Sequence, residues 1–416
     1  MRRTVARALT ALTTLAALTA CAATMLPAAQ ASAAVPAPTA TAAFRWSALA
    51  GSPLGSRSGP LVAWDGRQLL EFGGLVGNGS RAASAGAAFD PATGQWRTLA
   101  PVPAAAGVNL KDPTGLSLSL ASVWTGAYLA VANGLVKSCA TAASPCWTGV
   151  ALYDPKANRW TALTLPKQLD GLEVTAVTWT GRDIVVGAVD TAAFGTTGGR
   201  LAVAAYALAA RRWQVITPAV PRRHPGRFLD LAYAGGRLLL WSQWDRVAKT
   251  KDGFSDYAGV DVVARSADGA WRNVTGSWPQ QQTVPTPVRT PDGLLIAPGQ
   301  IWCGVACIAP PSSEPAYFAN PATLARKTIP GGPLGRAAPA YIWAGDAIIA
   351  LDQYTQVTGP GISIRPGDLA LFKPATSRWT GLPAVPGHPS LSVVPVWTGT
   401  ELLTLTDAGR LFALHA

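Results

Sequence analysis

Side chains that can act as metal ligands or catalytic bases are few in this sequence of 416 residues. Its three histidines, His224, His388 and His415, are isolated from one another along the chain. A bound transition metal needs several His, Cys or carboxylate ligands gathered in one place. The sequence therefore predicts no metal site and no cofactor.

Carboxylate pairs are the second chemistry to consider. Glu71 and Glu401 occupy second-strand positions in the repeat described below, and two approaching carboxylates are the machinery of glycoside hydrolysis. The favoured alternative is that each is a single polar residue of its strand. No Gly-x-Ser-x-Gly nucleophile turn and no phosphate-binding or dinucleotide-binding glycine pattern occurs. These residues favour a non-catalytic protein, but whether the protein is an enzyme stays open.

The first 33 residues predict an export signal. Arg2, Arg3 and Arg7 precede an apolar stretch over residues 8–20, which is too short to span a bilayer, and small-x-small cleavage sites follow up to Ala33. We expect free secretion and a short linker over residues 34–43. The alternative is a lipid anchor at Cys21, because Leu18-Thr-Ala-Cys21 resembles a lipoprotein cleavage motif.

Four cysteines remain after the signal: Cys139, Cys146, Cys303 and Cys307. An even number in an exported chain favours two disulfides. Pairing Cys139 with Cys146 and Cys303 with Cys307 closes short loops and is preferred, although four cysteines allow three pairings. Zinc is disfavoured because no histidine is adjacent. A redox role is disfavoured because three residues separate the second pair.

The charge pattern restricts the partners. The formal net charge is +12, but Lys and Arg are scattered and form no run of four. A nucleic-acid partner would call for a clustered basic stripe, so none is expected. A weak attraction to anionic surfaces such as a bacterial wall is one interpretation. Compositional bias toward arginine is the other, and it is favoured.

Tryptophan marks an internal repeat. A Trp-x-x-apolar element begins at Trp46, Trp96, Trp160, Trp213, Trp271 and Trp379, and Lys327 is expected in the slot of a missing copy. A second element, aromatic-x-Gly followed by an apolar run, ends at Gly66, Gly126, Gly181, Gly235, Gly293, Gly345 and Gly399, at intervals of 52 to 60 residues. Repeats of this length are typical of solenoids and propellers.

Each period predicts four short strands. A tight turn follows the first strand, an apolar second strand comes next, an acidic or polar residue and Pro end the third, and Trp-x-x-Leu is the fourth. Four strands repeated radially make a β-propeller blade. The sequence therefore predicts an all-β fold over residues 44–416, a seven-bladed β-propeller of four-stranded antiparallel blades. The N-terminal strand, Phe44 to Leu49, is expected to join the three-stranded C-terminal blade and close the ring.

The first blade resembles a kelch repeat, with Phe72-Gly73-Gly74 as the double glycine, then Phe89-Asp90-Pro91, then Trp96. The chain is thus similar to the kelch-like propellers that include the central domain of galactose oxidase. The isolated histidines do not support the copper site of that enzyme. A shortened form of the repeated sequence motif of sialidases occurs at Ser266-Ala-Asp268-Gly-Ala-Trp271. We interpret this segment as a turn before a fourth strand.

Five tryptophans are not used by the repeat and map to loops expected on one face: Trp147, Trp241, Trp244, Trp278 and Trp302. The predicted loop from Trp241 to Tyr257 adds Asp245 and Arg246. Tryptophan supplies contact area at low entropic cost, so this face is a candidate for stacking on sugars or anchoring a protein. The alternative is that each indole covers its own loop or a neighbouring disulfide.

The functional prediction is an exported, monomeric, non-catalytic binding or scaffold module for carbohydrate, a cell-wall polymer or a surface protein. The alternative is a carbohydrate-active enzyme, galactose-oxidase-like or sialidase-like, on the same ring.

Overall fold

In the computed structural model, the described residues are 44–76, 81–102, 120–133, 149–189, 200–218, 229–250, 253–277, 285–297, 316–331, 340–351, 368–387 and 393–415. Residues 1–37 and 38–416 are separate units, and all the described residues belong to the second. The signal sequence, the linker and all five cysteines lie outside the described residues.

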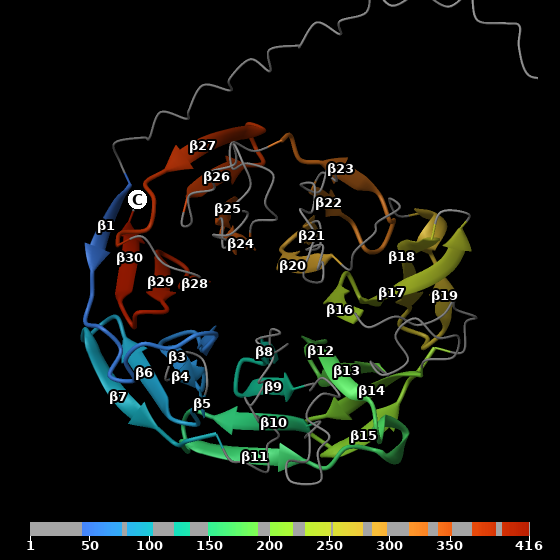
Figure 1. The fold of residues 1–416 in the computed structure, drawn as a ribbon, viewed down its shortest axis with the longest axis horizontal. Coiled ribbons are helices and arrows are strands. Elements are labelled where there is room, and N and C mark those ends of the chain that lie inside the picture. Colours follow the sequence, from blue (N-terminus) through green and yellow to red (C-terminus); the bar gives the residue numbers. More distant parts are fainter. Residues whose placement is uncertain are drawn as a thin grey trace, which may run out of the picture. The chain divides into compact units, whose positions relative to one another are not determined.

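The second unit is a ring of seven four-stranded antiparallel sheets (Figure 1). Blade 1 is β2 (Leu61–Trp64), β3 (Leu69–Phe72), β6 (Gly86–Asp90) and β7 (Gln95–Leu99). Blades 2 to 4 are β8 (Leu120–Trp124), β9 (Leu129–Asn133), β10 (Gly149–Asp154) and β11 (Arg159–Leu163); β12 (Glu173–Trp179), β13 (Asp183–Val189), β14 (Leu201–Ala207) and β15 (Arg212–Val215); and β16 (Leu229–Ala234), β17 (Arg237–Thr250), β18 (Gly253–Arg265) and β19 (Trp271–Asn273).

Blades 5 to 7 are β20 (Thr286–Thr290), β21 (Gly293–Ala297), β22 (Tyr317–Ala319) and β23 (Arg326–Thr328); β24 (Ala340–Ala344), β25 (Ala347–Leu351), β26 (Leu369–Lys373) and β27 (Arg378–Leu382); and β28 (Val393–Trp397), β29 (Leu402–Thr406), β30 (Leu411–His415) and β1 (Arg45–Ala48). A small ladder, β4 (Leu75–Val76) with β5 (Arg81–Ala82), and two 3-10 turns, η3 (Lys167–Leu169) and η5 (Thr275–Ser277), complete the described elements. The predicted seven-bladed propeller is confirmed.

Burial on both faces explains the apolar second and third strands. Every residue of β3, β25 and β29 is buried. A strand packed on both sides has no need of polar alternation, so it appears as a continuous apolar run. The core is therefore divided among the junctions between blades. Each of its clusters joins strands of neighbouring sheets, as Phe72 of blade 1 and Tyr153 of blade 2 show.

The ring is closed by the N-terminal strand, as predicted. β1 pairs antiparallel with β30, from Arg45 opposite His415 to Ala48 opposite Phe412. Figure 1 shows β1 beside β30, with the C-terminus at the same place. The imidazole of His415 lies 3.1 Å from the Glu401 carboxylate and within hydrogen-bond distance of Ser47. Closure thus joins the two ends of the described chain in one sheet.

The fourth-strand tryptophans connect neighbouring blades. In five of them the indole Nε1 donates to a backbone carbonyl just after the preceding blade's fourth strand: Trp46 to Pro383, Trp96 to Ala50, Trp160 to Ala100, Trp271 to Ile216 and Trp379 to Pro330, at 2.6–3.1 Å. The same rings pack on core aromatics, as Trp379 does on Phe372. Packing between blades, the role predicted for these residues, is therefore their role in the structure.

Blade 5 corrects the predicted register. Ala319 pairs with Arg326, as Phe89 pairs with Trp96 in blade 1. The residue in the tryptophan slot is therefore Arg326, and Lys327 lies one position later, on the opposite face of its strand. On the inner strand Arg289 pairs with Leu294, as Trp64 pairs with Leu69, so Arg289 holds the second aromatic slot. Blade 5 therefore has arginine in both the fourth-strand and the inner-strand slot. The aromatic residues that mark the repeat in sequence are missing there, so the register was predicted one position too late.

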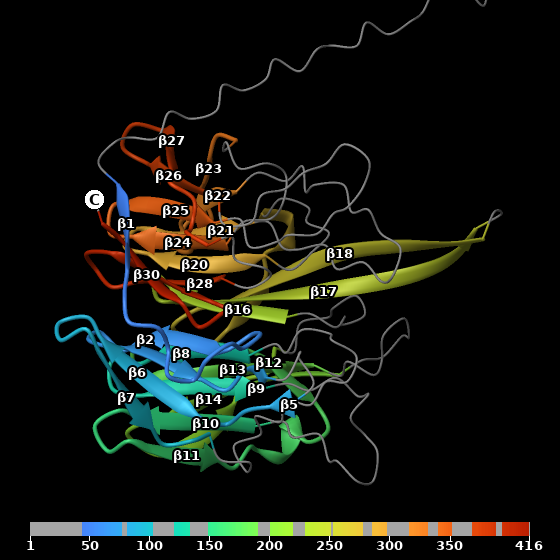
Figure 2. The same ribbon diagram turned by 60° about the vertical axis from the view of Figure 1, so that its left-hand side comes forward.

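The segment from Trp241 to Tyr257 also differs from its prediction as a loop. β17 and β18 are paired along their whole length, out to Thr250 opposite Gly253. Figure 2 shows this hairpin extending well beyond the other blades. Neither strand contains Pro, which would remove a donor from the ladder, so the pairing can continue past the blade.

Within the described residues, no helix combines the length and the apolar character needed to cross a membrane.

Candidate functional site

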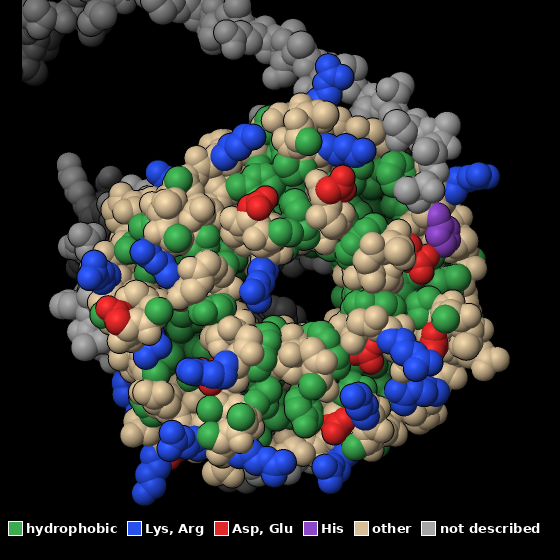
Figure 3. Space-filling model, turned by 180° about the vertical axis from the view of Figure 1, so that it is seen from behind, with side chains coloured by type: hydrophobic (Ala, Val, Ile, Leu, Met, Phe, Trp, Pro, Cys, Tyr) green, Lys and Arg blue, Asp and Glu red, His purple; other side chains and the backbone are tan. Residues whose placement is uncertain are grey.

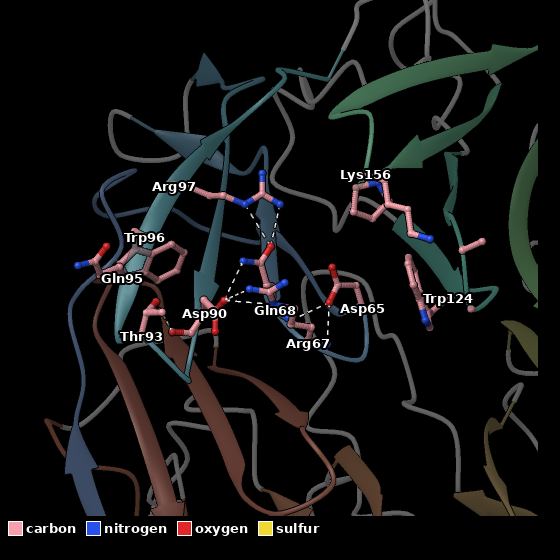
Figure 4. A pocket seen from close by; sticks show the side chains of 13 residues that line it. Asp65, Arg67, Gln68, Asp90, Thr93, Gln95, Trp96, Arg97, Trp124 and Lys156 are labelled. Atoms are coloured by element: carbon pink, nitrogen blue, oxygen red, sulfur yellow. Dashed lines mark hydrogen bonds and ion pairs between the residues drawn. The ribbon is translucent and has the colours of Figure 1, made fainter.

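A cavity of about 590 Å³ lies at the junction of blades 1 and 2 (Figure 4). Turns supply most of its lining: the β2–β3 and β6–β7 turns of blade 1 and the β8–β9 and β10–β11 turns of blade 2. Strand β7 adds one wall with Trp96 and Arg97. The cavity therefore opens on the face that carries the short turns.

Asp65 shapes the first wall. Its Oδ1 accepts hydrogen bonds from the backbone N–H groups of Arg67 (2.8 Å) and Gln68 (2.6 Å). Such a local side-chain bond fixes a tight turn, and Gly66 supplies the positive φ of 93° that the turn needs. The sequence Asp-Gly thus positions Arg67 and Gln68 at the cavity.

A hydrogen-bond network crosses blade 1 beneath the cavity. Arg67 forms an ion pair with Asp90 at 3.0 Å, and the Gln68 amide donates to the same carboxylate at 3.4 Å. The guanidinium of Arg97 donates two hydrogen bonds to the Gln68 Oε1, at 2.7 and 3.1 Å. Gln68 and Asp90 are buried whereas Arg67 and Arg97 are exposed, so the network connects the interior of the blade to its surface.

The network sets the charge state of the site. Burial acts to raise the pKa of Asp90, but hydrogen bonds from Arg67, the Ala92 N–H and Gln68 outweigh it, so the pKa lies below its usual value. Asp90 is therefore a fixed anion, neutralised by Arg67. The Arg97 guanidinium, in contrast, bonds to a neutral amide and has no carboxylate partner among the described residues.

The opposite wall comes from blade 2. Figure 4 shows Trp124 and Lys156 across the cavity from Arg97 and Asp65. Trp124 is half-buried, with part of its indole packed on the blade 1–2 core and the rest lining the cavity. Lys156 is exposed and forms no ion pair with a described residue. The lining carries Arg67, Arg97 and Lys156 against Asp65 and Asp90, a net formal charge of +1.

This arrangement suits one kind of ligand. An aromatic face beside a free cation can take a ring that bears a negative charge, and the fixed amide and carboxylate of the network can order its hydroxyl groups. Tyr153 lies in the core between blades 1 and 2, with its hydroxyl donating to Asn158 at 2.7 Å. Burial raises the pKa of Tyr153, so this phenol is a neutral structural group.

For most of the ligand-binding residues predicted from sequence, the structure describes no side chain. Trp147, Trp278 and Trp302 lie outside the described residues, as do Cys139, Cys146, Cys303 and Cys307. Trp244, Asp245 and Arg246 belong to strand β17, where only the backbone is described. Trp241 is fully buried in the core between blades 4 and 5, so it offers no exposed stacking surface and belongs to the framework.

The carboxylates considered for hydrolysis have separate partners. Glu71 is buried and accepts a short hydrogen bond from Ser52, and burial raises its pKa. Glu401 pairs with His415 at the closing strand. Among the described residues no group of three or more His, Cys, Asp or Glu side chains is placed to hold a metal ion. Ser266 and Asp268 bond to one another within the turn before β19, in agreement with their interpretation as turn residues.

Sequence reasoning missed Arg97, Lys156 and Trp124 as site residues. One sequence signal could have revealed this pair. Arg97 directly follows the fourth-strand Trp96, and the inner strand of the next blade carries Trp124. That signal is visible only when two blades are aligned by register.

Comparison with known proteins finds solved structures but no family. No protein-family model and no curated protein matches the sequence. Many chains of solved structures match. One, from a crystal structure of a mitotic checkpoint complex, is 13% identical with a TM-score of 0.49, covering 97% of this chain and 99% of that chain. The strand pairing itself shows the seven-bladed propeller, an architecture typical of binding and scaffold modules.

Proposed function

We propose that the protein is an exported, kelch-like propeller that binds an anionic carbohydrate, without catalysis, through the cavity between blades 1 and 2. One observation supports this above the others: the cavity joins the Trp124 indole to an Arg97 guanidinium that no described carboxylate neutralises. Stacking on the indole selects a ring, and the guanidinium selects a carboxylate or phosphate on that ring.

The kelch assignment is supported by blade 1. Gly73 and Gly74 both adopt positive φ, 69° and 83°. A Cβ at Gly74 would lie 3.1 Å from the Cβ of Arg57 and 3.3 Å from the backbone of Pro60, so a side chain does not fit there without a shift. Positive φ at both positions and the close contacts at Gly74 therefore explain why glycine occurs here.

The export assignment is supported by the leader pattern of residues 1–33 and by the four remaining cysteines. A cell-wall or extracellular polysaccharide with one negative charge per sugar unit is the matching partner class. Basic residues, which Figure 3 shows spread around the face opposite to that of Figure 1, would add a weak general attraction to such a polymer, although their scatter by itself favours compositional bias.

The test is calorimetric titration of residues 34–416 with digalacturonate, with its methyl ester as the uncharged counterpart. We expect binding of the acid and at least about tenfold weaker binding of the ester, because a charged hydrogen bond is lost. Trp124→Ala and Arg97→Gln should each weaken binding at this cavity by about tenfold or more. Arg159→Gln, which removes an exposed cation of β11 outside the cavity, is the control and should bind as the parent does.

Equal binding of acid and ester would contradict the proposal, as would an Arg97→Gln variant that binds normally. An arm with glycerol phosphate oligomers distinguishes phosphate from carboxylate as the source of the charge.

A further inference from the structure

A second cavity lies at the junction of blades 5 and 6 and has a volume of about 360 Å³. It is lined by the β20–β21 turn, by the β22–β23 hairpin and, from blade 6, by Trp343, Phe372, Pro374 and Ser377. These are the same kinds of turn that line the cavity between blades 1 and 2, so the two cavities open on the same face of the ring.

Strand register makes the two cavities equivalent. Lys327 pairs with Phe318 in blade 5, in the position where Arg97 pairs with Ala88 in blade 1. Trp343 pairs with Ile348 in blade 6, as Trp124 pairs with Leu129 in blade 2. In each case a basic side chain of the fourth strand faces a tryptophan of the next blade's inner strand across one junction.

The other junctions lack this pair. The residues that correspond to Arg97 in blades 2, 3, 4, 6 and 7 are Thr161, Gln214, Arg272, Thr380 and Ser47. Only Arg272 among them is basic, and the inner strand facing it carries Arg289 in the tryptophan slot. A cation opposite a tryptophan therefore occurs at two of the seven junctions, and each of these two contains a cavity.

The second cavity lacks the side chain that bonds to the basic residue in the first cavity. Gly293 stands where Gln68 stands in blade 1, because Leu294 pairs with Ala319 as Leu69 pairs with Phe89. A Cβ at Gly293 would lie 2.4 Å from the Ala319 carbonyl oxygen, and its φ is 148°, so no side chain fits there. The ammonium of Lys327 consequently has no hydrogen-bond acceptor among the described residues, and it is exposed.

The charge balance of the two cavities agrees. Asn320 replaces Asp90 and makes the same turn, accepting a hydrogen bond from the Ala322 N–H at 2.9 Å. Arg326 and Lys327 stand against Asp292 in the lining, which again gives a net formal charge of +1. Phe318 packs edge-on against Trp343, with ring centroids 6.2 Å apart, and so fixes the indole that forms the wall.

We propose that the blade 5–6 cavity is a second binding site for the same class of ligand, a sugar ring that carries a carboxylate or phosphate. The protein would then hold an anionic polymer at two places on one face. This inference rests on the proposed function, since the ligand class is taken from the first cavity. Two weak sites on one rigid ring bind a polymer more tightly than a single sugar unit, because the second contact is intramolecular.

The test is the stoichiometry of digalacturonate binding to residues 34–416 by calorimetry. We expect two sites per chain for the parent, one for Arg97→Gln, one for Lys327→Gln, and none detectable for the double variant. Arg272→Gln is the matched control, because it removes the equivalent cation at a junction without a tryptophan, and it should keep two sites. Polygalacturonate should bind the parent at least about tenfold more tightly than either single variant.

The outcomes separate the two proposals. One site in the parent that Arg97→Gln abolishes and Lys327→Gln leaves intact would overturn the second site and keep the first. No binding of the acid by any form would overturn the proposed function itself. Circular dichroism and the unfolding midpoint of each variant show that a lost site is not a lost fold. Lys327 is exposed and bonds to no described side chain, so we expect unchanged values for Lys327→Gln. Arg97→Gln loses two hydrogen bonds to Gln68, so we expect an unchanged dichroism spectrum and a somewhat lower unfolding midpoint.

Discussion

At the scale of the residue, Asp230 is a carboxylate whose surroundings disfavour the charged form. It lies on inner strand β16, opposite Trp241, and among the described residues its carboxylate accepts one hydrogen bond, from the Leu231 N–H at 2.7 Å. Burial raises the pKa of Asp230 to about 7, and that single hydrogen bond lowers it only in part. The folded state thus holds a proton that the unfolded chain releases near pH 4.

This pKa gives a direction for stability. Between about pH 4 and pH 7 the folded state binds more protons at Asp230, so the contribution of this residue to the free energy of unfolding falls as the pH rises. Asp230→Asn stays neutral and keeps a carbonyl oxygen for the Leu231 N–H. We expect the variant to gain stability over the parent, by roughly 2 kcal/mol more at pH 8 than at pH 5.

Urea unfolding at the two pH values measures this difference. Asp346→Asn, at an exposed turn position, is the control and should show no comparable gain. A gain for Asp230→Asn that is equal at both pH values would show that packing, and not ionisation, is responsible.

The candidate site shows which residues sequence alone can and cannot find. The tryptophans predicted to bind a ligand are the five that the repeat does not explain. Trp124 is a repeat residue, yet only part of its indole is used for packing and the rest lines the cavity. A single side chain can serve the framework and a site at once, and spacing along one blade does not reveal it.

At the scale of the element, the four-strand pattern of each blade is predictable because its sequence signals are local. Tight turns, apolar second strands and a fourth-strand tryptophan each lie within a few residues. Blade 5 was misread by one position because both of its tryptophan slots hold arginine. The outer part of the β17–β18 hairpin was predicted as a loop because its sequence carries no period-two alternation of apolar and polar residues.

The register in blade 5 predicts how a tryptophan would act there. Arg326→Trp restores the residue that five other blades use to donate from Nε1 to the preceding blade. We expect it to raise the free energy of unfolding by about 1 kcal/mol, through aromatic packing against blade 4 and one hydrogen bond. Urea unfolding at neutral pH measures the change.

Lys327→Trp is the matched control, since it places the same indole one residue later, facing blade 6. We expect no stabilisation from it and a loss of the blade 5–6 ligand site. Stabilisation by Lys327→Trp and not by Arg326→Trp would show that the slot is at 327 after all.

At the scale of the whole molecule, the ring depends on one strand pair between residues far apart in sequence. The four residues of β1 pair with β30, Trp46 packs on Phe412, and its Nε1 donates to the Pro383 carbonyl at 2.9 Å. The linking segment adds backbone hydrogen bonds from Leu49 to Leu411, from Ser52 to Gly409 and from Arg57 to Asp407. Closure therefore covers the edge of β30 and ties blade 7 to blade 1.

Removing β1 should convert a closed ring into one with an open edge. A chain of residues 50–416 leaves the backbone groups of β30 unpaired, and an exposed strand edge recruits another chain. We expect this truncation to lower the unfolding temperature by several degrees and to form oligomers in size-exclusion chromatography, whereas residues 44–416 stay monomeric and keep the parent's unfolding temperature. Adding a synthetic peptide of residues 44–49 should restore the monomer, because it refills the vacant strand position. A monomeric, equally stable 50–416 chain would mean that blade packing alone holds the ring together and that the strand exchange between the chain ends contributes little.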